Sequence, residues 1–233
     1  MLVNADICRV RPDSFVSFED GVARLATAAR EKGYERPWTA YQVVYGQTGT
    51  IGFSTLHDDW QSLGAQAPPA TVFEEVLGAE AGRKHFAATN ACLDQIESVV
   101  AIARDELSHA EPAGPSAPSQ TMMLTQLRAR PGGQEACEEL IRKIAEAIPK
   151  VDDPMRFRTF QTLVGDRLSY AIVVPLEGGL GALDQQLPVP ELLNQAFGTA
   201  EGGLIFRSGR EAIESLQTEI NLYREDLSNP RER

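Results

Sequence analysis

Arginine followed by carboxylates is the most conspicuous chemical pattern in this sequence, and the chain contains it twice. The two stretches differ only in the order of their acids: Arg104-Asp105-Glu106-Leu107-Ser108 and Arg224-Glu225-Asp226-Leu227-Ser228. A planar guanidinium can hold a carboxylate or phosphate ligand through two parallel hydrogen bonds. It can also pair with the acids beside it and serve only to hold the chain together. We expect the structural role, because a scaffold would need the same contacts in both halves.

Two more arginines in each half belong to this pattern, and a proline follows them. They are Arg9 and Arg11 in the first half, and Arg128 and Arg130 in the second. We expect these side chains to form ion pairs with acids at the rim of the fold, although the first and fourth strands of each half are not expected to be neighbours.

Gln42 and Gln161 are polar residues within stretches rich in aromatic and β-branched side chains, which predict strands. We expect both faces of these strands to be covered, and a buried amide without partners costs about 1–3 kcal/mol. Each glutamine could therefore line a ligand-binding cavity, or it could form a hydrogen bond across a pseudo-twofold axis. The sequence leaves both alternatives open.

The three histidines, His57, His85 and His109, have no counterparts in the other half of the chain. No two of them have the spacing of a metal-binding pair, so no metal site is expected. We expect His57 to lie at the surface just before a helix, and His109 to be solvated. The three cysteines are widely spaced without a CxxC motif, which favours reduced, mostly buried thiols in the cytoplasm.

The elements that position these residues are repeated along the chain. Arg9 and Arg128 lie 119 residues apart, as do Gln42 and Gln161. Each half predicts strand, helix, two strands, helices and a last strand, with the last helices running to about Glu97 and about Ser215. We therefore divide the chain into a first repeat, residues 1–109, a proline-rich linker, residues 110–120, and a second repeat, residues 121–233.

Composition limits the partners of this chain. Its 22 basic and 33 acidic residues give a net charge of −11, which argues against nucleic acid and against an anionic membrane surface. The first residues lack the apolar core of a secretory leader, and no run approaches the ~20 apolar residues of a membrane helix. A cytoplasmic location is expected.

The order of elements and their duplication resemble the dimeric α/β-barrel superfamily in a tandem, single-chain form. NIPSNAP-like and antibiotic-biosynthesis-monooxygenase-like proteins belong to this superfamily. The resemblance implies an α+β fold of two ferredoxin-like β-α-β-β-α-β modules, packed sheet to sheet as an intramolecular barrel. It does not imply one function, because the superfamily includes oxygenases, isomerases, haem enzymes and proteins of no known activity.

The resemblance also implies one specific catalytic alternative. Haem-degrading monooxygenases of this superfamily use an asparagine on the first strand, a tryptophan near the third strand and a helical histidine as the axial ligand of the iron. Asn4, Trp60 and His85 stand at such positions in the first repeat. In the second repeat Met123 replaces Asn4 and Ile205 replaces His85. Any such site would be single per chain, with haem as its cofactor.

Two classes of function remain, and the sequence does not decide whether the chain is an enzyme. The first is a scaffold or small-molecule-binding protein without an assignable reaction. The second is an oxygenase-type enzyme, dependent on haem or independent of any cofactor, with its single site in the first repeat. A cavity between the sheets, lined by Gln42 or Gln161, would favour a ligand. A small molecule is the expected partner, and assembly into a homo-oligomer is compatible with the sequence.

Overall fold

The computed structural model describes residues 1–110 and 118–230 of the chain. Most of the predicted linker, including Pro112 and Pro115, therefore lies outside the described residues. The chain forms two compact units. Unit 1 consists of Met1–Val100 together with the segment from Leu222 onward, and unit 2 consists of Ala101–Asn221. These units do not coincide with the sequence repeats, because the last residues of each repeat belong to the unit that consists mainly of the other repeat.

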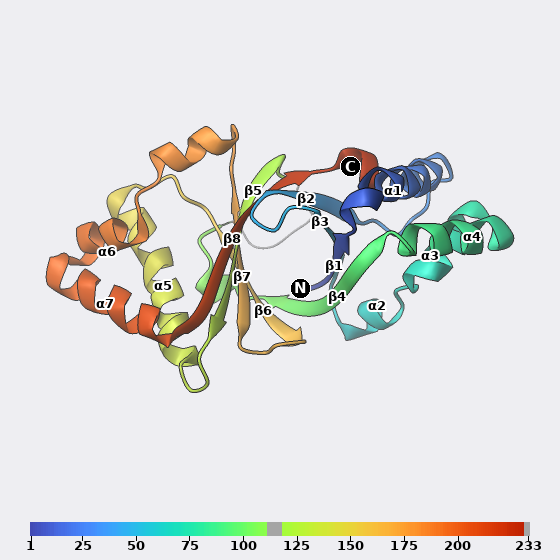
Figure 1. Ribbon diagram of the computed structural model, residues 1–233. Coiled ribbons are helices and arrows are strands. Elements are labelled where there is room, and N and C mark those ends of the chain that lie inside the picture. Colours follow the sequence, from blue (N-terminus) through green and yellow to red (C-terminus); the bar gives the residue numbers. More distant parts are fainter. Residues whose placement is uncertain (111–117, 231–233) are drawn as a thin grey trace. The chain divides into compact units, whose positions relative to one another are not determined.

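Unit 1 has its helices on one side of its strands (Figure 1). Its strands are β1 (Leu2–Val10), β2 (Thr39–Tyr45), β3 (Thr50–His57) and the first part of β4 (Leu93–Ala103). Its helices are α1 (Phe15–Glu31), α2 (Trp60–Gly64), α3 (Pro69–Leu77) and α4 (Ala79–Asn90). The predicted first helix is confirmed as α1, and its residues Phe18, Val22, Leu25 and Ala29, which recur at intervals of three and four, are all buried.

Unit 2 repeats this plan, again with its helices on one side of its strands (Figure 1). Its strands are β5 (Thr121–Ala129), β6 (Arg158–Val164), β7 (Ser169–Pro175) and most of β8 (Ile213–Tyr223). Its helices are α5 (Gln134–Val151), α6 (Val189–Phe197) and α7 (Thr199–Ala212).

The strand registers of the two units are related by the same 119-residue offset. In unit 1, β1 and β3 are antiparallel with Arg9 opposite Thr50. In unit 2, β5 and β7 are antiparallel with Arg128 opposite Ser169. The hydrogen-bonded order of the strands, β1-β3-β2-β8-β5-β7-β6-β4, closes on itself as a barrel. The predicted α+β class with an α/β barrel is thus confirmed, while its finer description as two tandem ferredoxin-like modules stays an interpretation.

The last strand of each repeat is longer than predicted. The helices were expected to continue to about Glu97 and Ser215, but α4 ends at Asn90 and α7 at Ala212. The expectation that the first and fourth strands are not neighbours was also wrong. β4 lies beside β1, and Ser98 Oγ donates to Asp6 Oδ1 at 2.5 Å. Residues with fair helix propensity form strand here because pairing with a neighbouring strand outweighs local preference.

The apolar core differs between the units. In unit 2 seventeen buried residues form one continuous cluster. In unit 1 most of the buried apolar residues belong to two separate clusters, one of eight residues around α1 and β1 and one of four residues that includes Phe73 of α3. Leu107 belongs to the unit 2 core and Leu227 to a unit 1 core, and both have 0% exposure. All three cysteines are buried and free, as predicted.

Candidate functional site

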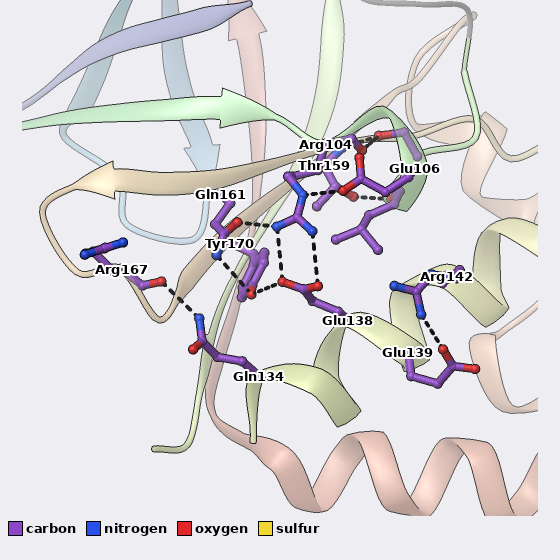
Figure 2. Close-up of polar contacts among 12 residues, drawn as sticks. Arg104, Glu106, Gln134, Glu138, Glu139, Arg142, Thr159, Gln161, Arg167 and Tyr170 are labelled. Atoms are coloured by element: carbon purple, nitrogen blue, oxygen red, sulfur yellow. Dashed lines mark hydrogen bonds and ion pairs between the residues drawn. The ribbon is translucent and has the colours of Figure 1, made fainter. Parts of the chain in front are cut away.

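Arg104, the residue that follows β4, stands at the centre of a polar cluster in unit 2 (Figure 2). Its Nη1 and Nη2 donate to the two carboxylate oxygens of Glu138 on α5, each at 3.1 Å. Its Nε donates to Glu106 Oε1 at 2.6 Å, and Nη1 also donates to the amide oxygen of Gln161 on β6. The hydroxyl of Tyr170 on β7 donates to Glu138 Oε1 at 2.6 Å. Every nitrogen of the guanidinium therefore has an acceptor.

The electrostatics of this cluster favour its charged form. Burial raises the pKa of Glu138, but the hydrogen bond from Tyr170 and the pair with Arg104 outweigh burial and hold that pKa below its ordinary value. Burial also raises the pKa of Glu106, but the hydrogen bond from Arg104, a backbone hydrogen bond and the charges of Arg104 and Arg142 together outweigh burial and lower that pKa. The carboxylates thus stay ionised and matched to the guanidinium at neutral pH.

Arg224 forms the corresponding cluster in unit 1. Its Nη1 donates to a carboxylate oxygen of Glu19 on α1, and also to Gln42 Oε1 on β2 at 2.6 Å. Its Nε and Nη2 donate to the two carboxylate oxygens of Asp226 at 2.9 and 2.7 Å. Glu19 and Gln42 lie 119 residues before Glu138 and Gln161, so the constellation is repeated. Two details differ: Arg224 holds Asp226 rather than the helix acid with two nitrogens, and Ile51 stands where unit 2 has Tyr170.

These two arginine clusters hold the ends of the repeats in place. Within unit 2, Ser108 Oγ donates to Arg104 O at 2.7 Å and accepts from the backbone N–H of Thr159 at 3.0 Å. Ser228 makes the same two contacts in unit 1, with Arg224 O and with the N–H of Ala40. The expected structural role of these arginines matches this geometry, and each glutamine has an arginine as its partner. The assignment of Gln42 and Gln161 to ligand binding stays a prediction.

The arginines of the first strands take other partners. Arg128 pairs with Asp166 at 2.5 Å and with Glu214. Arg11 lies 3.7 Å from Asp13 in an exposed pair. They therefore do not join the acids of the repeat endings.

The three residues of the haem alternative lie on different elements of unit 1. Asn4 is on β1, where its Nδ2 lies 3.4 Å from Gln66 Oε1. Trp60 begins α2 and is 55% exposed. His85 is on α4, its Nε2 lies 2.8 Å from Gly21 O, and its ring packs against Phe73. The described contacts thus link Asn4 to the segment after α2 and link His85 to the packing of α4 on α1 and α3.

Asn4 belongs to a polar group that we call the Asn4 cluster, made of Asn4, Thr55, His57 and Gln66. Asn4 and Thr55 are directly opposite each other on β1 and β3. Thr55 Oγ1 lies 2.9 Å from His57 Nε2 and 3.4 Å from Gln66 Oε1. All four side chains are half-buried, and α2, which connects the end of β3 to Gln66, packs on β1 and β3 without a buried residue of its own.

At three of the four corresponding positions unit 2 has apolar residues, whereas Gln66 corresponds to Gln185. Met123, Val174 and Leu176 stand 119 residues after Asn4, Thr55 and His57, and Met123 is opposite Val174 as Asn4 is opposite Thr55. Val174 and Leu176 are 3% and 2% exposed and belong to the continuous core. The polar Asn4 cluster thus stands where unit 2 has residues of its continuous apolar core.

Sequence reasoning identified Asn4 but missed its three neighbours, and it assigned His57 to the surface. For Thr55 and His57, the signal that could have found them is the repeat itself, whereas Gln66 has a glutamine as its counterpart and carries no such signal. Met123 was already recognised as the replacement for Asn4, and the same offset pairs His57 with Leu176 and Thr55 with Val174. A polar residue whose counterpart in the other repeat is apolar marks a position where the two halves have different roles.

Among residues 1–110 and 118–230, no group of three or more histidine, cysteine or acidic side chains is arranged to hold a metal ion. Within the same described ranges, no helix has both the length and the apolar character needed to cross a membrane.

The sequence matches no known protein family and no curated protein, so similarity rests on solved structures. An anthrone oxidase-like protein shares 12% identity with a TM-score of 0.59, covering 96% of this chain and 91% of its own. A proposed monooxygenase from Lactobacillus acidophilus NCFM shares 10% identity with a TM-score of 0.53, covering 98% and 95%. Chlorite dismutase from Candidatus Nitrospira defluvii in complex with imidazole shares 11% identity with a TM-score of 0.53, covering 97% and 93%. At these identities the similarity shows the dimeric α/β-barrel fold alone.

Proposed function

We propose that this chain is a small-molecule-binding protein with one binding site, at the Asn4 cluster of unit 1, while unit 2 serves as the structural half of the fold. The observation that carries the proposal is the exchange of residues between the repeats. Asn4, Thr55 and His57 stand where Met123, Val174 and Leu176 complete the core of unit 2.

The exchange has a cost that needs a reason. Polar groups in a half-buried position contribute less to stability than apolar ones, and those that remain unpaired lose their bonds to water. Unit 1 also has its core divided into two clusters. A scaffold gains nothing from this arrangement, since unit 2 shows that the same registers support a continuous apolar core. Binding a polar ligand would explain why the polar residues are kept.

The arginine clusters do not offer a comparable site. Their guanidinium nitrogens are paired with Glu138 and Glu106 in unit 2 and with Glu19 and Asp226 in unit 1. A carboxylate or phosphate ligand would have to displace these acids. Because both units contain such a cluster, the arginine clusters do not distinguish unit 1 from unit 2.

The test transfers the residues of unit 2 into unit 1. The triple variant Asn4→Met/Thr55→Val/His57→Leu should fold with a melting temperature close to that of the native protein, because three hydrogen-bonded partners are replaced together by apolar groups and the half-buried Gln66 can bond to water instead. A thermal-shift screen of small molecules should give ligands that stabilise the native protein, since a ligand at 100 times its Kd adds about 2.7 kcal/mol. The same ligands should leave the triple variant unshifted. Ligands that stabilise both proteins equally would refute the proposed site.

The second candidate is an oxygenase-type enzyme with its site in unit 1. It is favoured by the position of Asn4 within the cluster and by the fold shared with a proposed monooxygenase and an anthrone oxidase-like protein. The haem-dependent form requires His85 to give up the contact of its Nε2 with Gly21 O before that nitrogen can bind iron. Addition of haemin should then give a saturable Soret shift that His85→Ala abolishes. A shift that is absent, or that persists in His85→Ala, would leave the binding protein as the better proposal.

A further inference from the structure

The hydrogen-bond directions in the Asn4 cluster restrict the ligand, on the premise of the function proposed above. Gln66 Oε1 can only accept, so Asn4 Nδ2 and Thr55 Oγ1 both donate to it, each at 3.4 Å. Thr55 has a single hydroxyl proton. With that proton directed at Gln66, the Thr55 oxygen accepts from His57 Nε2–H at 2.9 Å. In this arrangement the His57 ring carries a proton on Nε2 and offers Nδ1 as an acceptor.

Three polar atoms remain after these bonds are made. His57 Nδ1 and Asn4 Oδ1 are acceptors, and Gln66 Nε2 is a donor. Within the described part of the chain, these three atoms have no hydrogen-bond partner. The two bonds to Gln66 Oε1 are longer than the usual 2.7–3.2 Å or so for such contacts, so a ligand could replace them at small cost.

The charges beside the cluster oppose an anionic ligand. Asp6 follows Asn4 by two positions on β1, so its side chain is on the same face of the strand. Asp58 and Asp59 follow His57 directly. The four members of the cluster include no lysine or arginine that could neutralise a carboxylate or phosphate.

We infer that the ligand is an uncharged organic molecule with at least two hydroxyl groups. Its hydroxyls donate to His57 Nδ1 and Asn4 Oδ1, and one of its oxygens accepts from Gln66 Nε2. Phenols and sugars share this chemistry, and the two are separated by experiment rather than by the hydrogen bonds.

The test uses the full chain and the fluorescence of Trp60, which is exposed on α2 between His57 and Gln66 in the sequence. Catechol represents the phenols and glucose represents the sugars. The fully methylated ethers of both probes lack the hydroxyl donors, and benzoate represents the anions. We expect a saturable change with one hydroxylated probe, binding weakened about tenfold or more in its ether, and no response to benzoate. Trp60→Phe should abolish the signal and thereby identify its source.

Two substitutions of His57 separate the acceptor from the bulk of the ring. His57→Asn keeps an acceptor oxygen near the position of Nδ1, whereas His57→Phe keeps a ring without an acceptor. Affinity for the hydroxylated probe should fall about fivefold to tenfold in His57→Phe and less in His57→Asn, while the ether should be indifferent to both.

The outcomes separate this inference from the proposed function. Ligands that need the Asn4 cluster but are anionic, or that bind equally well as ethers, would overturn the ligand class and leave the site intact. If the triple variant and the native protein respond identically to every ligand, the site falls and the inference falls with it. Cluster-dependent ligands that are neutral and hydroxylated would support both.

Discussion

At the scale of single residues, the two arginines that close the repeats are paired with acids and an amide of their own units. Arg104 and Arg224 each satisfy an acid on a helix, an amide on a strand and an acid two residues further along the chain. A half-buried ion pair with good geometry contributes more to stability than an exposed pair does. The value of each cluster therefore depends on its complete set of partners.

Arg104→Gln should lower the free energy of unfolding by about 1–3 kcal/mol at pH 7, because it leaves the half-buried Glu138 carboxylate unpaired. The folded-state pKa of Glu138 lies below its ordinary value of 4.5. Its contribution is thus fully present above that value and is lost as the pH falls through the folded-state pKa. The difference between Arg104→Gln and the native protein, measured by urea denaturation, should be constant from about pH 6 to 8 and shrink below about pH 4.

The matched control is Arg142→Gln, which removes the exposed pair with Glu139. Such pairs contribute little, so its effect should stay within about 0.5 kcal/mol. Equal losses for the two variants would show that the Arg104 cluster is an ordinary surface feature.

At the scale of elements, the glycines repeated between the halves mark places where helices meet. Gly78 and Gly198 have φ of 91° and 84°, a conformation that favours glycine, and each separates two helices of its unit. Four residues later, Gly82 and Gly202 lie against the backbone of the preceding helix. The spacing therefore reflects a sharp turn followed by a close helix crossing.

Two adjacent glycines of α7 should respond to alanine in opposite directions. A Cβ at Gly202 would lie 2.5 Å from Leu193 O, so Gly202→Ala should destabilise the protein by about 1–3 kcal/mol by forcing α6 and α7 apart. A Cβ at Gly203 would meet only Asn194 Oδ1, at 4.0 Å, so Gly203→Ala should stabilise by up to about 1 kcal/mol through helix propensity. Thermal unfolding of the two variants checks this, and changes of the same sign would contradict it.

The sequence predicted most of the elements because local signals dictate them. The helix α1 and the two successive strands of each half, β2 with β3 and β6 with β7, follow from periodicity and repetition. The start of β4 could not be predicted, because Leu93 to Ser98 becomes strand only through its neighbour β1. The partners of Asn4 were missed for a similar reason. Thr55 and Gln66 are ordinary residues until the register of β1 on β3 brings them together.

At the scale of the whole molecule, unit 1 contains two segments that are far apart in the sequence, and unit 2 contains one. The segment after Leu222 supplies Arg224, Leu227 and Asn229 to unit 1. Leu227 is buried in its core, and the side chain of Asn229 donates to the carbonyls of Tyr34 and Arg36, each at 3.0 Å.

A chain that ends at Asn221 should therefore lose structure in unit 1 and keep it in unit 2. Without Leu227 and the Arg224 cluster, unit 1 loses a core leucine, worth about 2–5 kcal/mol by itself, and the partner of Glu19. Hydrogen exchange should show amides of β2 and α1 exchanging quickly while those of β7 and α5 stay protected. Equal protection of both units in the truncated chain would show that the returning segment is dispensable.

The composition of unit 1 from both a leading and a trailing segment also bears on how the protein is made. The ribosome adds roughly 5–20 residues per second. Domains usually fold as they leave it, with the earliest residues folding first. In this chain we expect the two units to be completed in the reverse order. Residues 101–221 are all present before Leu227 is translated, whereas β1, α1 and β2 wait for it with their core open. We therefore expect unit 1 to be completed last, although most of its residues are translated before those of unit 2, and we expect its core to be open to chaperones during translation.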